Sequence, residues 1–232
     1  MKIAILSDIH GNYTALKSVF KEAKNLNVDK YLFLGDFTGY YYETKSVLES
    51  IRKLDHVMIK GNHELLLKDI INNKINIKKI TKKYGSGMEY ALKHLNNDEI
   101  NYLIKLPSRK EIVLDETKIL IAHGSPWDIK NYIYPDSSLK DKQRCLNGDF
   151  DFVFIGHSHY SFVYEYKDKV LINVGSIGQN RKHGGIATWC FLDTDKNYYE
   201  IKKTKYDIYE LLNQIERNDP NNKYLKNVLL RN

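Results

Sequence analysis

The sequence predicts an α/β protein in which two mixed β-sheets are flanked by helices. Short β-branched or aliphatic runs alternate with amphipathic stretches through the first half of the chain, as in strands joined by helical crossovers. After His159 the pattern changes to short alternating runs separated by polar turns, which is typical of hairpins. Because the two kinds of strand are segregated along the chain, we expect two sheets. With 232 residues, 42% of them hydrophobic, the chain is long enough for one domain over residues 1–232.

Ten segments have the length and composition of strands. In the first half these are Lys2–Ser7, Lys30–Leu34, His56–Lys60, Ile112–Leu114, Ile119–His123 and Phe152–Ile155. In the second half they are Phe162–Tyr166, Val170–Val174, Ile186–Leu192 and Tyr198–Lys203. Polar turns at Lys167–Lys169 and Asp193–Asn197 join the later strands into hairpins.

Apolar residues at helical spacing predict helices between and after these strands. The helical regions are Leu16–Leu26, Val47–Leu54, Leu65–Leu106 and Ile208–Ile215. Within the third region, Asn97 or Asp98 is the expected cap of a helix over Glu99–Ile104, and Pro107 ends it. The last helix leads into a polar tail, so we expect a C-terminal helix and tail over about residues 206–232.

Composition excludes several classes of protein. The formal charge of +7 is spread over scattered basic pairs, which indicates a solvated face, and we expect no stable nucleic-acid complex. No segment approaches the roughly 18 apolar residues of a membrane helix, so no membrane association is expected. The two cysteines, Cys145 and Cys190, form neither a disulfide framework nor a thiolate zinc motif, which favours a reducing, cytoplasmic location.

Histidines carry the functional signal, because five of the eight lie in short polar motifs directly after predicted strands. The motifs are Asp8–Asn12, Gly35-Asp36, Gly61–Glu64, Ala122–Gly124 and Gly156–His159. Open α/β sheets place their ligands at the carboxyl ends of strands, so these side chains are expected to gather there. Imidazole and carboxylate groups suit divalent Zn, Mn, Fe or Co, and two carboxylates, one amide and four imidazoles suit a site with two metal ions.

In this order, the five motifs resemble the signature D-x-H, G-D, G-N-H-[DE], H and G-H-x-H of the calcineurin-like metallophosphoesterase superfamily. The resemblance extends from Asp8 to about Arg181 and implies a four-layer αββα sandwich. The segment Asn173–Arg181 is also similar to the N-P-G-S-x-G-x-x-R segment of small bacterial and archaeal phosphodiesterases, with Val174 in place of the usual proline.

The resemblance implies a role for each motif residue. One metal ion would be bound by Asp8, His10 and His159, the other by Asn62, His123 and His157, and Asp36 would bridge them. The implied cofactors are two divalent ions, Mn²⁺ first, with Fe, Zn, Co or Ni as alternatives. A hydroxide bridging the two ions would attack the phosphorus.

The remaining roles concern the leaving group and the substrate. His63 is the expected general acid, and Glu64 is expected to orient its imidazole, although many small family members have Asp at that position. Arg181 would offer a planar fork to a phosphate, with Ser176 in a tight turn at the floor of the cleft. Tyr40, Tyr41 and Tyr42 either stack on an aromatic substrate group or pack against helices.

The leading hypothesis is hydrolysis of a small or nucleotide-like phosphodiester. The alternatives within the enzyme class are a phosphomonoesterase or protein phosphatase, and a hydrolase of dinucleoside polyphosphates. A scaffold without catalysis is a remote alternative, because such proteins lose metal ligands and all seven ligand positions are present here. By analogy with related small phosphoesterases, a homodimer is a further expectation.

Overall fold

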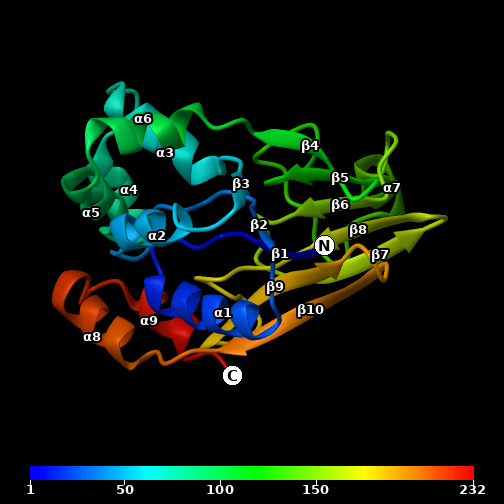
Figure 1. The fold of residues 1–232 in the computed structure, drawn as a ribbon. Coiled ribbons are helices and arrows are strands. Elements are labelled where there is room, and N and C mark those ends of the chain that lie inside the picture. Colours follow the sequence, from blue (N-terminus) through cyan, green and yellow to red (C-terminus); the bar gives the residue numbers. More distant parts are fainter.

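The computed structural model describes residues 1–232, and its ten strands form two five-stranded sheets (Figure 1). In spatial order, the first sheet consists of β10 (Tyr198–Lys205), β9 (Ile186–Asp193), β1 (Lys2–Leu6), β2 (Lys30–Phe33) and β3 (His56–Met58). The second consists of β4 (Arg109–Leu114), β5 (Thr117–Ala122), β6 (Phe152–Ile155), β8 (Lys169–Asn173) and β7 (Phe162–Tyr166). All ten predicted strands are therefore confirmed.

The strands divide between the sheets differently from the expected segregation along the chain. The β9–β10 hairpin pairs antiparallel with β1, while β1, β2 and β3 are parallel to one another. In the second sheet β5, β6 and β8 are parallel, whereas β4 and β7 are antiparallel edge strands. The two mixed sheets are confirmed, but the reason given for them was wrong, because the last hairpin returns to the N-terminal strand.

Alternate side chains of the strands face different layers, as the two-residue period of a strand requires. Ile3 and Ile5 of β1 lie in a core shared with Ile121 and Phe154 of the second sheet, so the two sheets pack face to face. Ala4 and Leu6 point the opposite way into the larger core formed with helices. The outer face of the second sheet is covered by α7 (Leu139–Cys145), whose Cys145 packs in a third core with residues of β5 and β6. This helix completes four layers in the order αββα.

Nine helices supply the outer layers (Figure 1). They are α1 (Tyr13–Asn25), α2 (Thr44–Ile51), α3 (Asn62–Ile71), α4 (Ile77–Tyr84), α5 (Gly87–His94), α6 (Asn97–Lys105), α7 (Leu139–Cys145), α8 (Tyr209–Asn218) and α9 (Lys223–Leu229). Helix α7 is not predicted above, although Ser138 caps it by accepting a hydrogen bond from Asp141 N. None of the helices has both the length and the apolar composition that a membrane crossing requires.

Two local expectations need comment. The cap of α6 is Asn96, whose side chain accepts from Glu99 N, and not Asn97 or Asp98. The carboxylate of Glu99 in turn accepts from Asn96 N, which explains why the helix begins at Asn97, two residues before the predicted start. Cys190 lies in the core between the sheets, and Cys145 is the buried last residue of α7; both have free thiols.

Candidate metal centre

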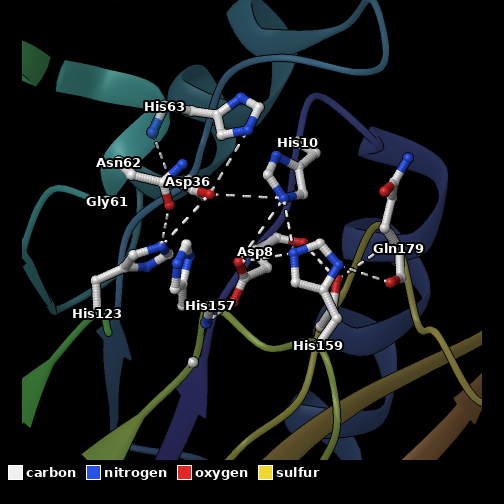
Figure 2. Close-up of polar contacts among 12 residues, drawn as sticks. Asp8, His10, Asp36, Gly61, Asn62, His63, His123, His157, His159 and Gln179 are labelled. Atoms are coloured by element: carbon white, nitrogen blue, oxygen red, sulfur yellow. Dashed lines mark hydrogen bonds and ion pairs between the residues drawn. The ribbon is translucent and has the colours of Figure 1, made fainter. Parts of the chain in front are cut away.

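The loops that follow β1, β2, β3, β5 and β6 meet at one end of the two sheets. The carboxyl ends of these strands lie there, because β1, β2 and β3 are parallel in one sheet and β5 and β6 in the other. Figure 2 shows the polar side chains of these loops pointing toward one another. The residues brought together are Asp8, His10, Asp36, Asn62, His63, His123, His157 and His159. The expected gathering of the five motifs is therefore observed.

The backbone at this site is held in an uncommon conformation. Asp8, His10, Asp36, His157 and His159 have φ values of 55°, 53°, 55°, 63° and 61°, in the left-handed region that residues with a Cβ seldom adopt. Cross-loop hydrogen bonds maintain it, including His10 N to Asp36 O and Asp8 N to Gly35 O. Strain of this kind persists where the surrounding structure enforces it and is typical of functional sites.

The carboxylates of Asp8 and Asp36 are each oriented by a hydrogen bond from a backbone N–H group. Asp8 accepts a hydrogen bond from His157 N with Oδ2, and Asp36 accepts one from His63 N with Oδ1. A Cβ on Gly61 would lie 2.1 Å from Asp36 Oδ1, so only glycine allows this approach. The second oxygen of each carboxylate remains directed at the imidazoles.

Asp8, His10 and His159 form the first group of possible ligands. Nδ1 of His10 lies 3.0 Å from Thr38 O, and Nδ1 of His159 lies 2.8 Å from Gln179 O. A carbonyl oxygen only accepts, so Nδ1 of each ring donates to it, which directs both Nε2 atoms into the cluster. These Nε2 atoms are 3.3 Å apart, and the buried Asp8 Oδ1, 3.1 Å from His159 Nε2, accepts no hydrogen bond.

Asp36, His123 and His157 form another group, with Asn62 beside it. Nδ1 of His123 donates to Leu34 O at 2.7 Å, which directs Nε2 at Asn62 Oδ1, 2.9 Å away. Nε2 of His157 faces Lys130 O at 3.2 Å, which leaves its Nδ1 for the cluster. Asp36 Oδ2 lies between the two groups, 3.4 Å from His123 Nε2 and 3.7 Å from His10 Nε2.

The charges of these groups depend on one another. Burial opposes ionisation of Asp36, but His123 and His63 outweigh it and hold its pKa well below the usual range. Burial also acts against protonation of His123, yet Asp36 and Asp8 raise the pKa of that imidazole to about 9. Burial, followed by repulsion from His123, lowers the pKa of His157 to about 4. Without metal, His123 is thus protonated, and a cation that binds here displaces its proton.

This donor set fits divalent cations. Oxygen atoms and imidazole nitrogen atoms face one another across the cluster, and most of these pairs have no proton between them. A positive ion placed among these atoms would be bound by their lone pairs. Both carboxylates are buried and anionic, which is stable only with such compensation.

His63 lies at the edge of the cluster, with its Nε2 4.0 Å from Asp36 Oδ2. Its ring stacks on Tyr40 at a centroid distance of 5.2 Å and meets the edge of Tyr84 at 5.1 Å. Burial lowers the pKa of this imidazole, while Asp36 acts in the opposite direction. A bound phosphoryl group would also favour the protonated ring.

The expected orienting role of Glu64 is wrong. Its carboxylate accepts hydrogen bonds from the backbone N–H groups of Asp36, Phe37, Thr38 and Gly61 at 2.8 to 3.2 Å. Consecutive helix residues point in different directions, so Glu64 at the start of α3 faces the β2 loop and not the imidazole of His63. Tyr40 and Tyr84 hold the His63 ring, and Glu64 holds the loop that carries Asp36.

We expect Glu64→Ala to destabilise the protein by roughly 3 kcal/mol or more, because each of four buried N–H donors loses its acceptor at a cost of about 1 to 3 kcal/mol. The measurement is urea unfolding of the metal-free protein. Glu64→Gln keeps one acceptor oxygen and serves as the matched variant with a smaller loss. A change below about 1 kcal/mol for Glu64→Ala would contradict this role.

Ser176 also differs from its expected place at the substrate. It is fully buried, its Oγ donates to Asp8 O at 2.8 Å, and the same Oγ accepts from Gln179 N at 2.8 Å. The hydroxyl therefore supports the loop behind Asp8 and cannot reach a ligand. Its burial follows from the turn between β8 and β9, which passes under the first loop.

A cavity of about 460 Å³ opens over the cluster. The predicted residues Asp36, Asn62, His63, His157, His159 and Arg181 line it. Of the three adjacent tyrosines only Tyr40 reaches the cavity, while all three are buried in the helix-side core. The same walls also carry residues that were not predicted from the sequence: Lys83, Tyr84, Tyr132, Tyr160, Tyr224 and Arg231. No motif marks these residues, although the high tyrosine content of the chain, 18 residues, was a signal that tyrosines could line the site.

The chain matches a known protein family and a relative of nearly the same length. A family model described as a calcineurin-like phosphoesterase superfamily domain matches residues 1–197. An uncharacterized protein of Methanocaldococcus jannaschii is 31% identical over 236 residues, which cover 93% of this chain and 92% of that protein.

Two solved structures share the fold across nearly the whole chain. A hypothetical protein from Pyrococcus horikoshii OT3 has a TM-score of 0.85 at 19% identity, over 99% of this chain and 98% of that one. A metallophosphoesterase from Sphaerobacter thermophilus has a TM-score of 0.79 at 22% identity, with the same coverage of 99% and 98%. At these identities the likeness concerns the architecture.

Proposed function

Because the chain belongs to the calcineurin-like phosphoesterase superfamily, we propose that it is a phosphodiesterase that uses two divalent ions to hydrolyse a small or nucleotide-like phosphodiester. The family supports the coarser statement, a metal-dependent phosphoester hydrolase. The observation that carries the proposal is the convergence of imidazole nitrogen and oxygen atoms from two groups of side chains around Asp36 Oδ2, at the floor of a cavity.

The ligands divide between two ions in this proposal. Asp8, His10 and His159 hold one ion, Asn62, His123 and His157 hold the other, and Asp36 lies between them. Mn²⁺ is the proposed ion, with Fe, Co, Ni or Zn as alternatives, because selection among these ions at a site of oxygen and imidazole donors depends on metal availability as well as on affinity. When bound, such ions lower the pKa of water and neutralise charge on a phosphoryl group.

The chain's own residues then bind and orient the ester. Arg181 is the proposed partner of the phosphoryl oxygens, since its planar guanidinium lines the cavity and can donate two parallel hydrogen bonds. His63 is the proposed donor of a proton to the departing oxygen, because it borders both the cluster and the cavity. The ring packing around His63 limits its motion and keeps Nε2 toward the reacting group.

The cavity favours a diester of small size. A volume of about 460 Å³ lies in the range of pockets that hold small molecules. Tyrosines on its walls offer apolar contact to a second organic substituent, which a diester has and a monoester lacks. These features support a small-molecule diester over a phosphorylated protein chain.

The test is hydrolysis of bis(p-nitrophenyl) phosphate and p-nitrophenyl phosphate by chelator-stripped protein, before and after addition of Mn²⁺. We expect Mn²⁺ to restore activity and kcat/KM for the diester to exceed that for the monoester by about tenfold or more. A reversed ratio would instead identify a monoesterase. If neither ester is cleaved with Mn²⁺, Co²⁺, Ni²⁺ or Zn²⁺, although calorimetry shows binding of the ion, the proposed function is wrong.

A further inference from the structure

Three basic side chains line the cavity above the metal cluster. Lys83 comes from the end of α4, Arg181 from the loop after β8, and Arg231 from the residues that follow α9. None of the three forms an ion pair with a carboxylate. Asp36 is the one carboxylate among the lining residues, and it faces the cluster. The walls of the cavity therefore carry an excess of positive charge.

Two of these cations are fixed close together. Nη1 of Arg231 donates a hydrogen bond to Arg181 O, so the second guanidinium is anchored on the backbone that carries the first. Nε of Arg181 is buried and has no hydrogen-bond partner. A buried guanidinium donor without an acceptor is costly. Because Arg181 also lines the cavity, its guanidinium can bind an anion there.

Residues 219–231 are firmly docked, so Arg231 is a built part of the wall. The carboxylate of Asp219 accepts hydrogen bonds from Ser86 N, Ser86 Oγ and Tyr42 Oη at 2.8 to 3.1 Å. Near the other end of this segment, Gly184 N donates to Arg231 O at 2.7 Å. The segment lies beyond residue 197, where the match to the family model ends.

Aromatic rings stand beside these charges. Tyr132 stacks on His157 with a centroid distance of 3.9 Å and an interplanar angle of 22°, and 43% of its surface is exposed. Tyr84 and Tyr224 both contact Tyr40, at centroid distances of 5.3 and 6.1 Å. Partly exposed tyrosine rings such as that of Tyr132 can stack on planar organic groups such as nucleobases.

We propose that the cavity binds a nucleotide bearing a phosphate in addition to the ester that is hydrolysed, and that Lys83 and Arg231 hold this additional phosphate. A simple diester has one negative charge, which Arg181 and the metal ions would balance, so it leaves Lys83, which lies over the Tyr84 ring, and Arg231 without an anionic partner. A second phosphate supplies the missing charge and accepts charge-assisted hydrogen bonds. This inference rests on the proposed function of the same site and adds the class of its substrate.

Calorimetric titration of Mn²⁺-loaded protein tests the inference without hydrolysis. The ligands are AMP, with one phosphate, and ADP and adenosine 3′,5′-bisphosphate, each with two. We expect at least one of the latter to bind about tenfold more tightly than AMP. We expect Lys83→Gln and Arg231→Gln each to remove most of this advantage while changing the affinity for AMP less.

Two control variants lose the same charge outside the cavity. Lys82→Gln alters the neighbouring residue of α4, and Arg217→Gln alters an exposed residue of α8 that is paired with Glu210. Both are expected to retain the preference for the second phosphate, which separates a defined subsite from general attraction by a basic protein. Equal affinities for all three ligands, or equal losses in the controls, would overturn the inference.

The two proposals fail in different ways. If the protein cleaves the reporter diester but shows no gain from a second phosphate, the additional subsite is wrong and the phosphodiesterase remains. If no ester is cleaved but the second phosphate still improves binding through Lys83 and Arg231, the subsite stands and the assigned reaction is wrong.

Discussion

The Asp36→Asn protein is expected to lose phosphodiester hydrolysis by about 10³-fold or more and to bind one Mn²⁺ ion in place of two. Asp36 Oδ2 is the atom that faces both groups of candidate ligands, so in the proposed two-ion site the removal of its charge would weaken the binding of both ions. The electrostatic stabilisation supplied by metal ions amounts to several kcal/mol, and each 1.36 kcal/mol is about tenfold in rate. Steady-state kinetics and calorimetric stoichiometry provide the measurement.

Asp55→Asn is a suitable control for this variant. It removes the same charge from an exposed carboxylate paired with Lys30, away from the cluster, and is expected to retain full activity. Thermal unfolding of both metal-free proteins will show whether the asparagine at position 36 is accommodated. Retention of two ions and of more than about a tenth of the activity in Asp36→Asn would contradict the bridging position.

The second large effect concerns His63→Ala and depends on the leaving group. With a dinucleoside monophosphate, whose leaving group is a ribose alkoxide, the loss is expected to be about 10² to 10⁴-fold, the range of general acid catalysis. With bis(p-nitrophenyl) phosphate the loss is expected to be much smaller, because p-nitrophenolate departs without a proton. The ratio of kcat values for the two substrates is the measurement.

His94→Ala serves as the matched control, since His94 is an exposed residue at the end of α5. It is expected to leave both rates unchanged. If His63→Ala lowers both rates by the same factor, the imidazole acts in binding or in positioning the cluster and does not donate the proton.

The gathering of the five motifs was predictable from sequence, because each follows a strand and the carboxyl ends of parallel strands meet at one edge. The pairing of β1 with β9 could not be predicted from the sequence. β9 lies more than 180 positions away, and a hairpin pattern shows that two strands pair with each other but not which edge receives them. The sheets were therefore counted correctly and divided incorrectly.

The predicted roles of Glu64 and Ser176 were wrong for the same reason: the side chain of each points in a direction that the sequence does not reveal. Glu64 is adjacent to His63 in sequence, yet the helical turn directs it to the β2 loop. Ser176 is near Arg181, yet its hydroxyl points under Asp8. Proximity along the chain predicts neither direction, which depends on how the loops cross.

The walls of the cavity were the least predictable part of the site. Lys83 lies in a lysine-rich helix and Arg231 in a polar tail, where charged residues ordinarily face water. Only the docking of residues 219–231 against Ser86 and Gly184 brings them together. The residues of the candidate metal centre were thus predictable from local motifs, whereas the residues that line the walls of the cavity depend on tertiary packing.

The return of β9 to β1 has a consequence for the way the protein is made. During synthesis β1 emerges first, but one of its two edges stays unpaired until β9 leaves the ribosome, and His159 must likewise appear before it can join Asp8. Such distant contacts slow folding, and an open strand edge invites association with other chains. The candidate metal site therefore cannot be complete before residue 159 has emerged, and the covering of β1 comes later still, because β9 begins at Ile186.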